Sequence, residues 1–201
     1  DTIEIESTGR PAGHPWVELS RLREVPDSMP DGQSLSLVLS DGTCLGSGVF
    51  DRRFPRAAWR RHSHAEGVFF DEAYIASALV EAIERRAEES CQRLVSSDAD
   101  YLPGIVVEIY GDVVWVCLET AAARAQSDVV AEVIREIVNP VEIVVSADGV
   151  PVTLSGQGLK GRWVDLDELL FRIDLLDTTK PRVFLDQREQ HALFGSLCEG
   201  R

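Results

Sequence analysis

The sequence predicts an α+β protein: a small β-barrel, then a β-β-α-β-β domain, and then only the start of a further α/β domain. Three observations support this order. Short apolar runs alternate with turn residues over residues 1–70, a helical period occupies 71–90, and one amphipathic helix then lies between two pairs of apolar runs. A chain of 201 residues is long enough for one large or two small domains.

The distribution of charged residues also divides the chain near residue 70. Residues 1–70 hold eight arginines against ten acidic residues, whereas 71–201 hold twelve basic against twenty-four acidic residues, within a net charge of −14. Different compositions indicate domains with different surfaces. We therefore expect a barrel over 1–70, a linking helix over 71–92, a central domain over 93–176 and the start of another domain over 177–201.

The barrel is predicted from short strands and Asp-Gly turns. The segment Ser34–Ser40 partly alternates and is bounded by Asp31-Gly32 and Asp41-Gly42, and Leu45–Phe50 follows as another short strand. Asp-Gly pairs favour the positive φ angles of hairpin turns. Short strands with turns at this spacing are typical of a small barrel.

The apolar residues of the next segment, 71–90, recur with a helical period. Ile75, Leu79 and Ile83 recur every four residues, with charged residues on the opposite side. This spacing predicts an amphipathic helix that joins the two domains.

The central domain is predicted as strand, strand, helix, strand, strand. Ser127 is a candidate N-cap for the helix, and Asn139-Pro140 ends it. One helix would then cover one face of a small antiparallel sheet. The expected strands are Gly104–Tyr110, Val113–Thr120, Val141–Ser146 and Val150–Leu154, and the apolar face of the helix runs over Val129–Val138.

The pattern at the end of the chain predicts the start of an α/β domain. An apolar run at Val183–Leu185 leads into a charged, helix-starting segment, Asp186–His191, and the sequence stops at Arg201. A domain needs roughly 100 residues to bury its own core. We therefore expect the rest of that domain, and the chemistry, to lie beyond this chain.

Several classes of protein are excluded by the sequence. No apolar run approaches the roughly 20 residues that span a bilayer, and the first residues lack the features of a signal peptide. The four cysteines are far apart and have no nearby histidine, so we expect no metal site and a reduced, cytoplasmic protein. No catalytic triad, metalloprotease or P-loop pattern is present.

Three motifs favour structural interpretations. Gly156–Gly161 matches G-x-G-x-x-G, but the extended segment after it is not the helix that a dinucleotide site requires, so we expect an ordinary glycine turn. Asp98 and Asp100 lie in a turn before a strand, where carboxylates more often cap than catalyse. Trp16, after the turn Gly13-His14-Pro15, is expected in the core, and the role of His14 stays open.

One segment is both basic and aromatic. Arginine pairs with phosphate and stacks on bases, so the segment is a candidate RNA-binding site; a solvated strand with balanced charges is the alternative. The acidic total argues against nonspecific nucleic-acid binding but allows a local basic face. The arginines are Arg52, Arg53, Arg56, Arg60 and Arg61, with Phe54, Trp59, His62 and His64 among them.

Several stretches of the sequence occur together, and in this order, in one family of proteins. They are Gly13-His-Pro-Trp-Val17, Asp41-Gly-Thr-Cys-Leu-Gly-Ser-Gly48 with Arg60 after it, Arg93-Leu-Val95, Asp98–Asp112 and Phe184-Leu-Asp-Gln-Arg-Glu189. Each motif is weak alone, but their order is specific. Through them the chain resembles, over nearly its whole length, the PUA-containing, S-adenosylmethionine (SAM)-dependent 23S ribosomal RNA methyltransferases of the large-subunit methyltransferase I, cytosine-C5 type.

The resemblance implies three parts: a PUA-like RNA-binding barrel, the β-β-α-β-β domain, and a Rossmann-like methyltransferase domain of which only the start is present. It implies structured RNA, rRNA in this family's case, as the partner, with His14 added to the five arginines as a candidate contact. It implies SAM as the cofactor of the parent protein, with Lys180, Gln187 and Arg188 near it. The family's nucleophilic cysteine would lie in the missing part, so no catalytic residue is assigned here.

The sequence also departs from the family. In place of G-Q-K-T-G it has Thr178-Thr-Lys180-Pro-Arg182, which keeps the lysine and loses both glycines. Loss of that glycine pair removes the close backbone approach to a ligand. We therefore expect no SAM bound to this chain alone. The alternative to an enzyme part is a non-catalytic RNA- or protein-binding module derived from the family.

Overall fold

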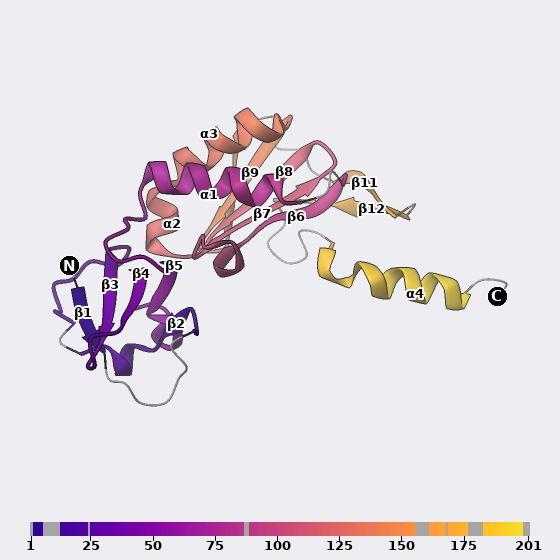
Figure 1. Ribbon diagram of the computed structural model, residues 1–201. Helices are drawn as coiled ribbons and strands as arrows, with labels where there is room; N and C mark the ends of the chain where they lie inside the picture. Colours follow the sequence, from indigo (N-terminus) through magenta and orange to yellow (C-terminus); the bar gives the residue numbers. More distant parts are fainter. Residues whose placement is uncertain are drawn as a thin grey trace.

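The computed structural model describes residues 2–5, 13–23, 25–86, 89–155, 161–167, 169–176 and 183–198 (Figure 1). In these residues helices and strands are mixed, and the strands form two five-stranded sheets and one two-stranded sheet. The α+β class is therefore confirmed. The glycines 156 and 158 and Lys180 lie outside the described residues.

The first sheet has the strand order β1-β3-β4-β5-β2. Only β1 and β3 pair in parallel; the other neighbours are antiparallel. Two short 3-10 turns, η1 (Leu19–Arg21) and η2 (Pro55–Ala57), connect its strands. The strands are β1 (Thr2–Ile5), β2 (Trp16–Val17), β3 (Ser34–Leu39), β4 (Cys44–Phe50) and β5 (Trp59–Ser63).

The central sheet has the order β10-β9-β8-β7-β6, with only β8 and β9 parallel. It has one strand more than the sequence predicted, because β6 pairs with β7 in front of the expected hairpin. The prediction of an all-antiparallel four-stranded sheet was therefore wrong. The strands are β6 (Cys91–Ser96), β7 (Ile105–Tyr110), β8 (Val113–Leu118), β9 (Glu142–Ala147) and β10 (Val150–Ser155), and η3 (Ser97–Asp100) follows β6.

Helices cover one face of the central sheet. Helix α1 (Glu72–Glu84) begins at Asp71, whose carboxylate accepts a hydrogen bond from the Tyr74 amide at 3.0 Å. Helix α3 (Ser127–Val138) ends at Asn139, whose φ of 50° stops the helix as predicted. Ser127 is not its N-cap: the short helix α2 (Ala121–Ala125) comes directly before it, and Gln126 is the residue between the two.

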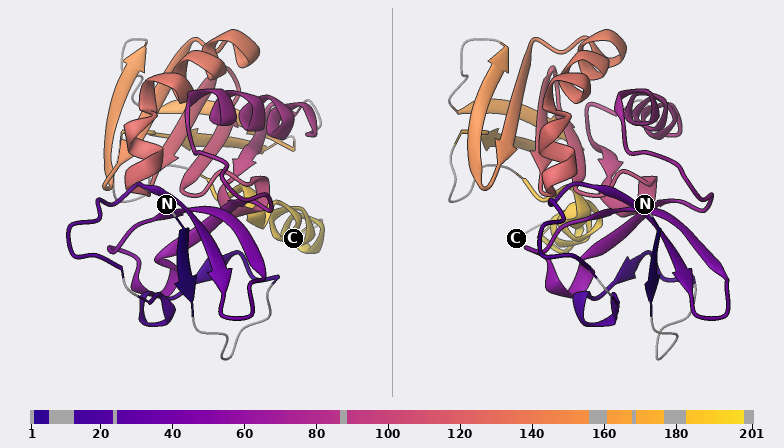
Figure 2. Two further views of the ribbon diagram at one scale, coloured as in Figure 1. Left: turned by 60° about the vertical axis from the view of Figure 1, so that its left-hand side comes forward. Right: turned by 90° about the vertical axis from the view of Figure 1, so that its left-hand side faces the viewer.

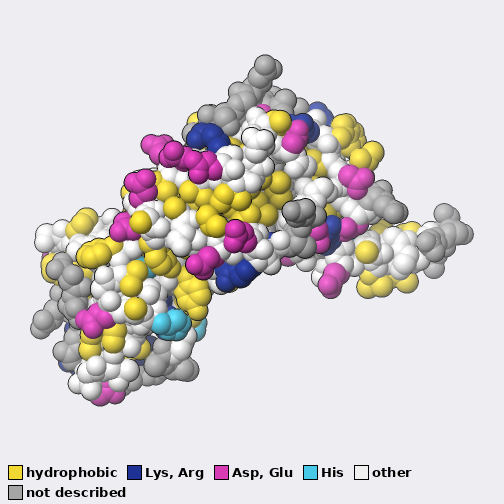
Figure 3. Space-filling model, turned by 45° about the horizontal axis from the view of Figure 1, so that its top comes forward, with side chains coloured by type: hydrophobic (Ala, Val, Ile, Leu, Met, Phe, Trp, Pro, Cys, Tyr) yellow, Lys and Arg dark blue, Asp and Glu magenta, His cyan; other side chains and the backbone are white. Residues whose placement is uncertain are grey.

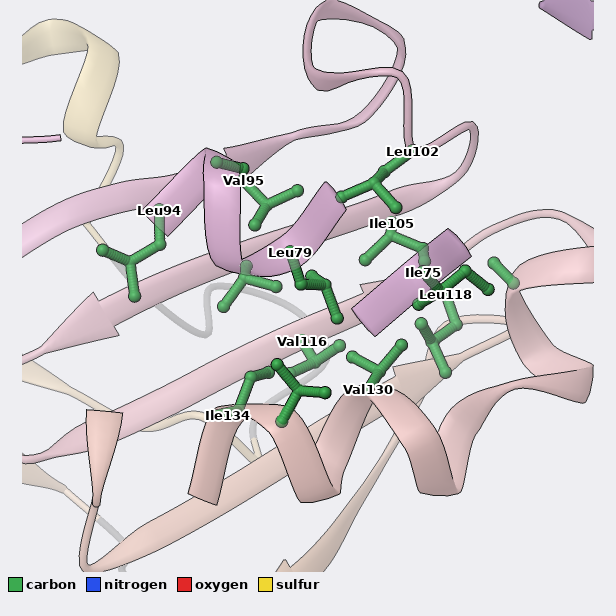
Figure 4. Close-up of a cluster of buried hydrophobic side chains, with 14 of the residues drawn as sticks. Ile75, Leu79, Leu94, Val95, Leu102, Ile105, Val116, Leu118, Val130 and Ile134 are labelled. Atoms are coloured by element: carbon green, nitrogen blue, oxygen red, sulfur yellow. The ribbon is translucent and has the colours of Figure 1, made fainter. Parts of the chain in front are cut away.

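The main hydrophobic core lies between these helices and the sheet (Figure 4). Ile75 and Leu79 of α1 and Ile134 of α3 are fully buried against Val116 of β8. Each such side chain stabilises the fold by roughly 1.5–3 kcal/mol relative to an exposed one. The predicted period of the 71–90 segment is thus explained by packing, although the described helix ends at Glu84.

The opposite face of the central sheet carries a hairpin, β11 (Arg162–Leu166) and β12 (Leu169–Ile173). Val164 and Ile173 pack there with Trp115 of β8. The strand β11 follows Gly161, so the segment after the glycines is extended, as expected for a turn and not for a dinucleotide site. Two views in Figure 2 show the first sheet at one end of the central sheet.

The last described elements are η4 (Leu185–Gln187) and α4 (Arg188–Cys198). No residue of α4 is buried, and the helix projects from the body (Figure 1). Its apolar side chains Leu193, Phe194 and Leu197 are exposed.

Candidate nucleic-acid interface

The arginine-rich segment lies where the first sheet meets the central sheet. Arg52 and Arg53 follow β4, Arg56 lies in η2, and Arg60 and Arg61 lie on β5. Most of these side chains are already bonded within the protein. The bonds decide which arginine is available to a ligand.

Arg60 connects the two sheets. Its Nε donates to Asp98 Oδ1 at 2.9 Å, a second guanidinium nitrogen contacts Asp98 Oδ2, and Nη2 donates to Ser97 Oγ at 2.9 Å. The Arg60 side chain is only 7% exposed. Arg60 is thus held in place by η3, 38 residues away in the sequence.

Arg53 is bonded to Asp51 in a similar way. Its Nε and Nη2 donate to the two Asp51 oxygens at 3.0 and 2.6 Å, and the same carboxylate accepts from the Ala121 amide at 2.8 Å. Burial alone would raise the pKa of Asp51, but the hydrogen bonds from Arg53 and Ala121 hold that pKa below its ordinary value. Asp51 therefore stays charged and fastens α2 to the first sheet.

Arg52 and Arg61 bond mainly to backbone carbonyls. Arg52 donates to the carbonyls of Pro26 and Met29, and Arg61 donates to the carbonyl of Gly13 at 3.0 Å. Arg61 is buried, whereas Arg52 is partly exposed. Both arginines fix loops of the first sheet.

Arg56 differs from the other four. It is exposed on η2, and within the described part of the chain no hydrogen bond or ion pair of its guanidinium is found. It is therefore the arginine that can bind an anion without first giving up an internal partner.

An open cavity of about 500 Å³ lies beside Arg56. The Arg60 guanidinium carbon lies 5.9 Å from the Trp16 ring centroid and 6.0 Å from that of Phe54, within the range of cation–π contact. Two aromatic rings and three arginines therefore line one cavity. Its lining residues are Trp16, Arg53, Phe54, Pro55, Arg56, Ala57, Arg60 and Glu119.

Trp16 is 39% exposed, so its predicted place in the core was wrong. The adjacent Val17 is buried instead, because the two residues of β2 face opposite sides. His14 holds the start of this strand: its Nδ1 accepts a hydrogen bond from the Trp16 amide at 3.0 Å, and its ring lies edge-on to the indole at 5.7 Å. His14 thus positions Trp16.

Trp59, the other aromatic residue singled out with the arginines, is fully buried and donates through Nε1 to the Leu35 carbonyl at 3.0 Å. Sequence reasoning missed Glu119, which directly follows β8 of the central sheet and lines the cavity. Its only sequence signal is a carboxylate directly after a buried strand. The prediction that the five arginines and His14 contact RNA stays a prediction.

The residues expected near a cofactor lie elsewhere. Gln187 is exposed at the end of η4. Arg188 is bonded to Asp167 and Glu89, and these carboxylates raise its pKa above the ordinary value. The Arg188 guanidinium therefore has internal partners, and the prediction that Gln187 and Arg188 lie near a cofactor stays a prediction.

The described residues contain no group of three or more His, Cys, Asp or Glu placed to hold a metal ion. None of their helices is long and apolar enough to cross a membrane. Asp98 and Asp100 lie in a turn, as predicted: Asp100 accepts from the Ser96 amide at 2.6 Å and pairs with Arg85 and Arg86.

Sequence comparison relates the chain to ribosomal RNA large subunit methyltransferases I. It is 25% identical over 205 residues to the protein of that name from Shewanella amazonensis, covering 94% of this chain and 52% of the relative. It is 25% identical over 194 residues to the one from Alteromonas mediterranea, covering 89% and 49%. The resemblance drawn from the motifs is confirmed, and the chain spans about half the length of these curated relatives. No family model matches the chain.

Solved structures share the fold. A Streptococcus mutans protein named as a SAM-dependent methyltransferase has a TM-score of 0.77 at 18% identity, covering 94% of this chain and 52% of the other. A protein named as a methyltransferase and crystallised with S-adenosylhomocysteine has a TM-score of 0.76 at 17% identity, with the same coverage. At these identities the similarity concerns the fold alone.

Proposed function

We propose that this chain is the RNA-engaging part of a SAM-dependent methyltransferase that modifies a base of large-subunit rRNA. The similarity to ribosomal RNA large subunit methyltransferases I over 94% of the chain supports this proposal. Residues 1–70 would act as a PUA-like barrel, 71–92 as the linking helix and 93–176 as the central domain. Residues 177–201 would begin a Rossmann-like domain.

The observation that carries the RNA-binding role is the cavity at the junction of the two sheets. It combines Arg56, for which no partner is found among the described residues, with two aromatic rings that are accessible from solvent. RNA-binding proteins use cations for phosphates and aromatic faces for unstacked bases. In this proposal Arg56 contacts phosphate directly, whereas Arg60 and Arg61 keep the walls of the cavity in position.

The charges on the rest of the surface favour RNA binding at one local site. On the face shown in Figure 3, which brings α1 and α3 forward, acidic side chains lie around a central apolar area. Acidic groups repel the phosphate backbone, so RNA would be confined to the arginine-lined junction. Gln187 and Arg188 would lie at the margin of the methyltransferase domain, and SAM would be held by the whole protein.

RNA binding can be tested with a labelled fragment of large-subunit rRNA. We expect the affinity of this chain to fall between 50 and 200 mM salt, and Arg56→Ala to weaken binding and reduce the slope of log K against log salt by about one. Arg135→Ala, which removes an exposed arginine from α3, is the matched control and should change neither. Equal effects of the two substitutions, or no RNA binding, would contradict the proposal.

A further inference from the structure

Two aromatic side chains and the guanidinium of Arg60 line the junction cavity. Trp16 comes from β2 and Phe54 from the loop before η2, and the Arg60 guanidinium lies within 6.0 Å of both ring centroids. The bonds of Arg60 to Asp98 and Ser97, and of Trp16 to His14, fix this arrangement without a ligand. A preformed site loses less entropy on binding.

Among the residues that line the cavity, Glu119 is the single acidic one. Glu119 lies on the cavity wall with its side chain 47% exposed, and its Oε2 is 3.7 Å from Arg60 Nη1. Arg60 is already paired with Asp98, so Glu119 is not needed to neutralise it. The Glu119 carboxylate is therefore a hydrogen-bond acceptor that faces the same space as the aromatic rings.

We propose that this cavity binds one unpaired nucleobase that has an exocyclic amino group, with guanine preferred, stacked on Trp16 and Phe54 and bonded at its Watson–Crick edge to Glu119. The proposal rests on the RNA-binding function proposed above and names what that site recognises. A volume of about 500 Å³ is within the range of small-molecule pockets and accommodates a purine.

The preference follows from the chemistry of Glu119. An ionised carboxylate only accepts hydrogen bonds. Guanine presents two neighbouring donors, N1–H and the N2 amino group, which match the two carboxylate oxygens. Adenine and cytosine present one amino group beside a ring-nitrogen acceptor, and uracil presents one N–H between two carbonyls. The expected order is therefore guanine first and uracil last.

Tryptophan fluorescence can report the stacking. The chain has four tryptophans, of which Trp59 and Trp115 are buried and Trp163 lies exposed on the distant hairpin β11–β12. In a Trp163→Phe background, quenching by a bound base reports on Trp16. The probes are a uridine hexanucleotide and the same hexanucleotide with one central guanosine.

We expect the guanosine probe to quench the fluorescence and to bind about tenfold more tightly than the all-uridine probe. Glu119→Gln should reduce this preference to less than about threefold, because an amide offers one acceptor and one competing donor group. Trp16→Leu should remove the quenching and weaken binding at least about fivefold, whereas Trp16→Phe, which keeps a ring, should retain most of the affinity. Thermal unfolding of each variant verifies that it is folded.

The outcomes separate the two proposals. If the rRNA fragment binds but both hexanucleotides bind equally, or if Trp16→Leu binds as well as the parent, the base-binding inference is overturned and RNA binding stands. If neither the rRNA fragment nor a hexanucleotide binds, the RNA-binding function itself is overturned.

Discussion

The guanidinium of Arg60 on β5 and the carboxylate of Asp98 in η3 form a two-point ion pair, with Nε 2.9 Å from Oδ1. The side chains are 7% and 12% exposed. This pair joins the first sheet to the central sheet, and it also holds the guanidinium that lies within 6.0 Å of the ring centroids of Trp16 and Phe54. Stability and site geometry therefore depend on the same contact.

Removing one partner of this pair should be costly. Arg60→Ala leaves Asp98 as a poorly solvated charge, and we expect it to lower the free energy of unfolding by about 3–5 kcal/mol in urea titrations. Arg162→Ala, which breaks the exposed pair with Asp112, is the control and should cost less than about 1 kcal/mol. A double-mutant cycle with Asp98→Asn should give a coupling energy of about 1–3 kcal/mol; additive effects would mean that the pair does not stabilise the junction.

A second prediction concerns Gly48 on β4. A Cβ atom at this position would lie 2.3 Å from Trp59 Cε2 and 2.6 Å from the Arg60 carbonyl oxygen. Gly48→Ala must therefore displace Trp59 and the backbone of β5, and we expect it to lower the free energy of unfolding by about 3 kcal/mol. Gly195→Ala is the control, because nothing lies within 4 Å of its Cβ position in α4. Comparable melting temperatures for the two variants would show that the close approach of β4 and β5 is not required.

Local features of the fold were predictable from the sequence because their causes are local. Asp148 and Gly149 have φ angles of 51° and 77°, the geometry for which an Asp-Gly hairpin turn is favoured. The helix end at Asn139 follows in the same way from one residue and its backbone conformation. Periodicity likewise identified the faces of α1 and α3 that are buried.

Features that depend on contacts between residues far apart in the sequence were not predictable. Strand β6 has a mixed composition, and Arg93 within it is balanced by the buried Glu108 of β7, a pairing that only the folded sheet reveals. The arginine-rich segment was recognised, but nothing in it indicated that Arg60 pairs with Asp98 whereas Arg56 stays unpaired among the described residues. Glu119 was missed because it enters the cavity from the other sheet.

A third prediction concerns helix α4, which has no buried residue. Leu193 and Phe194 make exposed apolar surface, so the double substitution Leu193→Glu, Phe194→Glu should leave the melting temperature of this chain nearly unchanged and reduce the binding of a hydrophobic dye. Leu79→Ala, at a fully buried position in α1, should instead cost about 2–5 kcal/mol. A large loss of stability in the double variant would mean that α4 packs against the body.

The last prediction concerns pH. His62 on β5 is buried beside Phe70 and Tyr74, with ring centroids 5.2 and 4.9 Å away, and its Nε2 lies 3.1 Å from the Val68 carbonyl oxygen. Burial, only partly offset by that carbonyl, lowers the pKa of His62 from its ordinary value to about 4. The folded protein therefore keeps His62 neutral at pH values where the unfolded chain protonates it.

The free energy of unfolding depends on pH because the folded and unfolded chains differ in proton binding at His62. Between pH 4 and about 6.5 the unfolded chain binds more protons at His62, so stability rises with pH through this window and is lost as pH falls. We expect the free energy of unfolding to be about 2 kcal/mol lower at pH 5 than at pH 7 because of His62. His62→Phe, which places an apolar ring among the neighbouring aromatic rings, should remove most of this difference, whereas His64→Ala, at an exposed position, should keep it. Urea unfolding at both pH values measures the difference, and an unchanged slope in His62→Phe would assign the titration to another group.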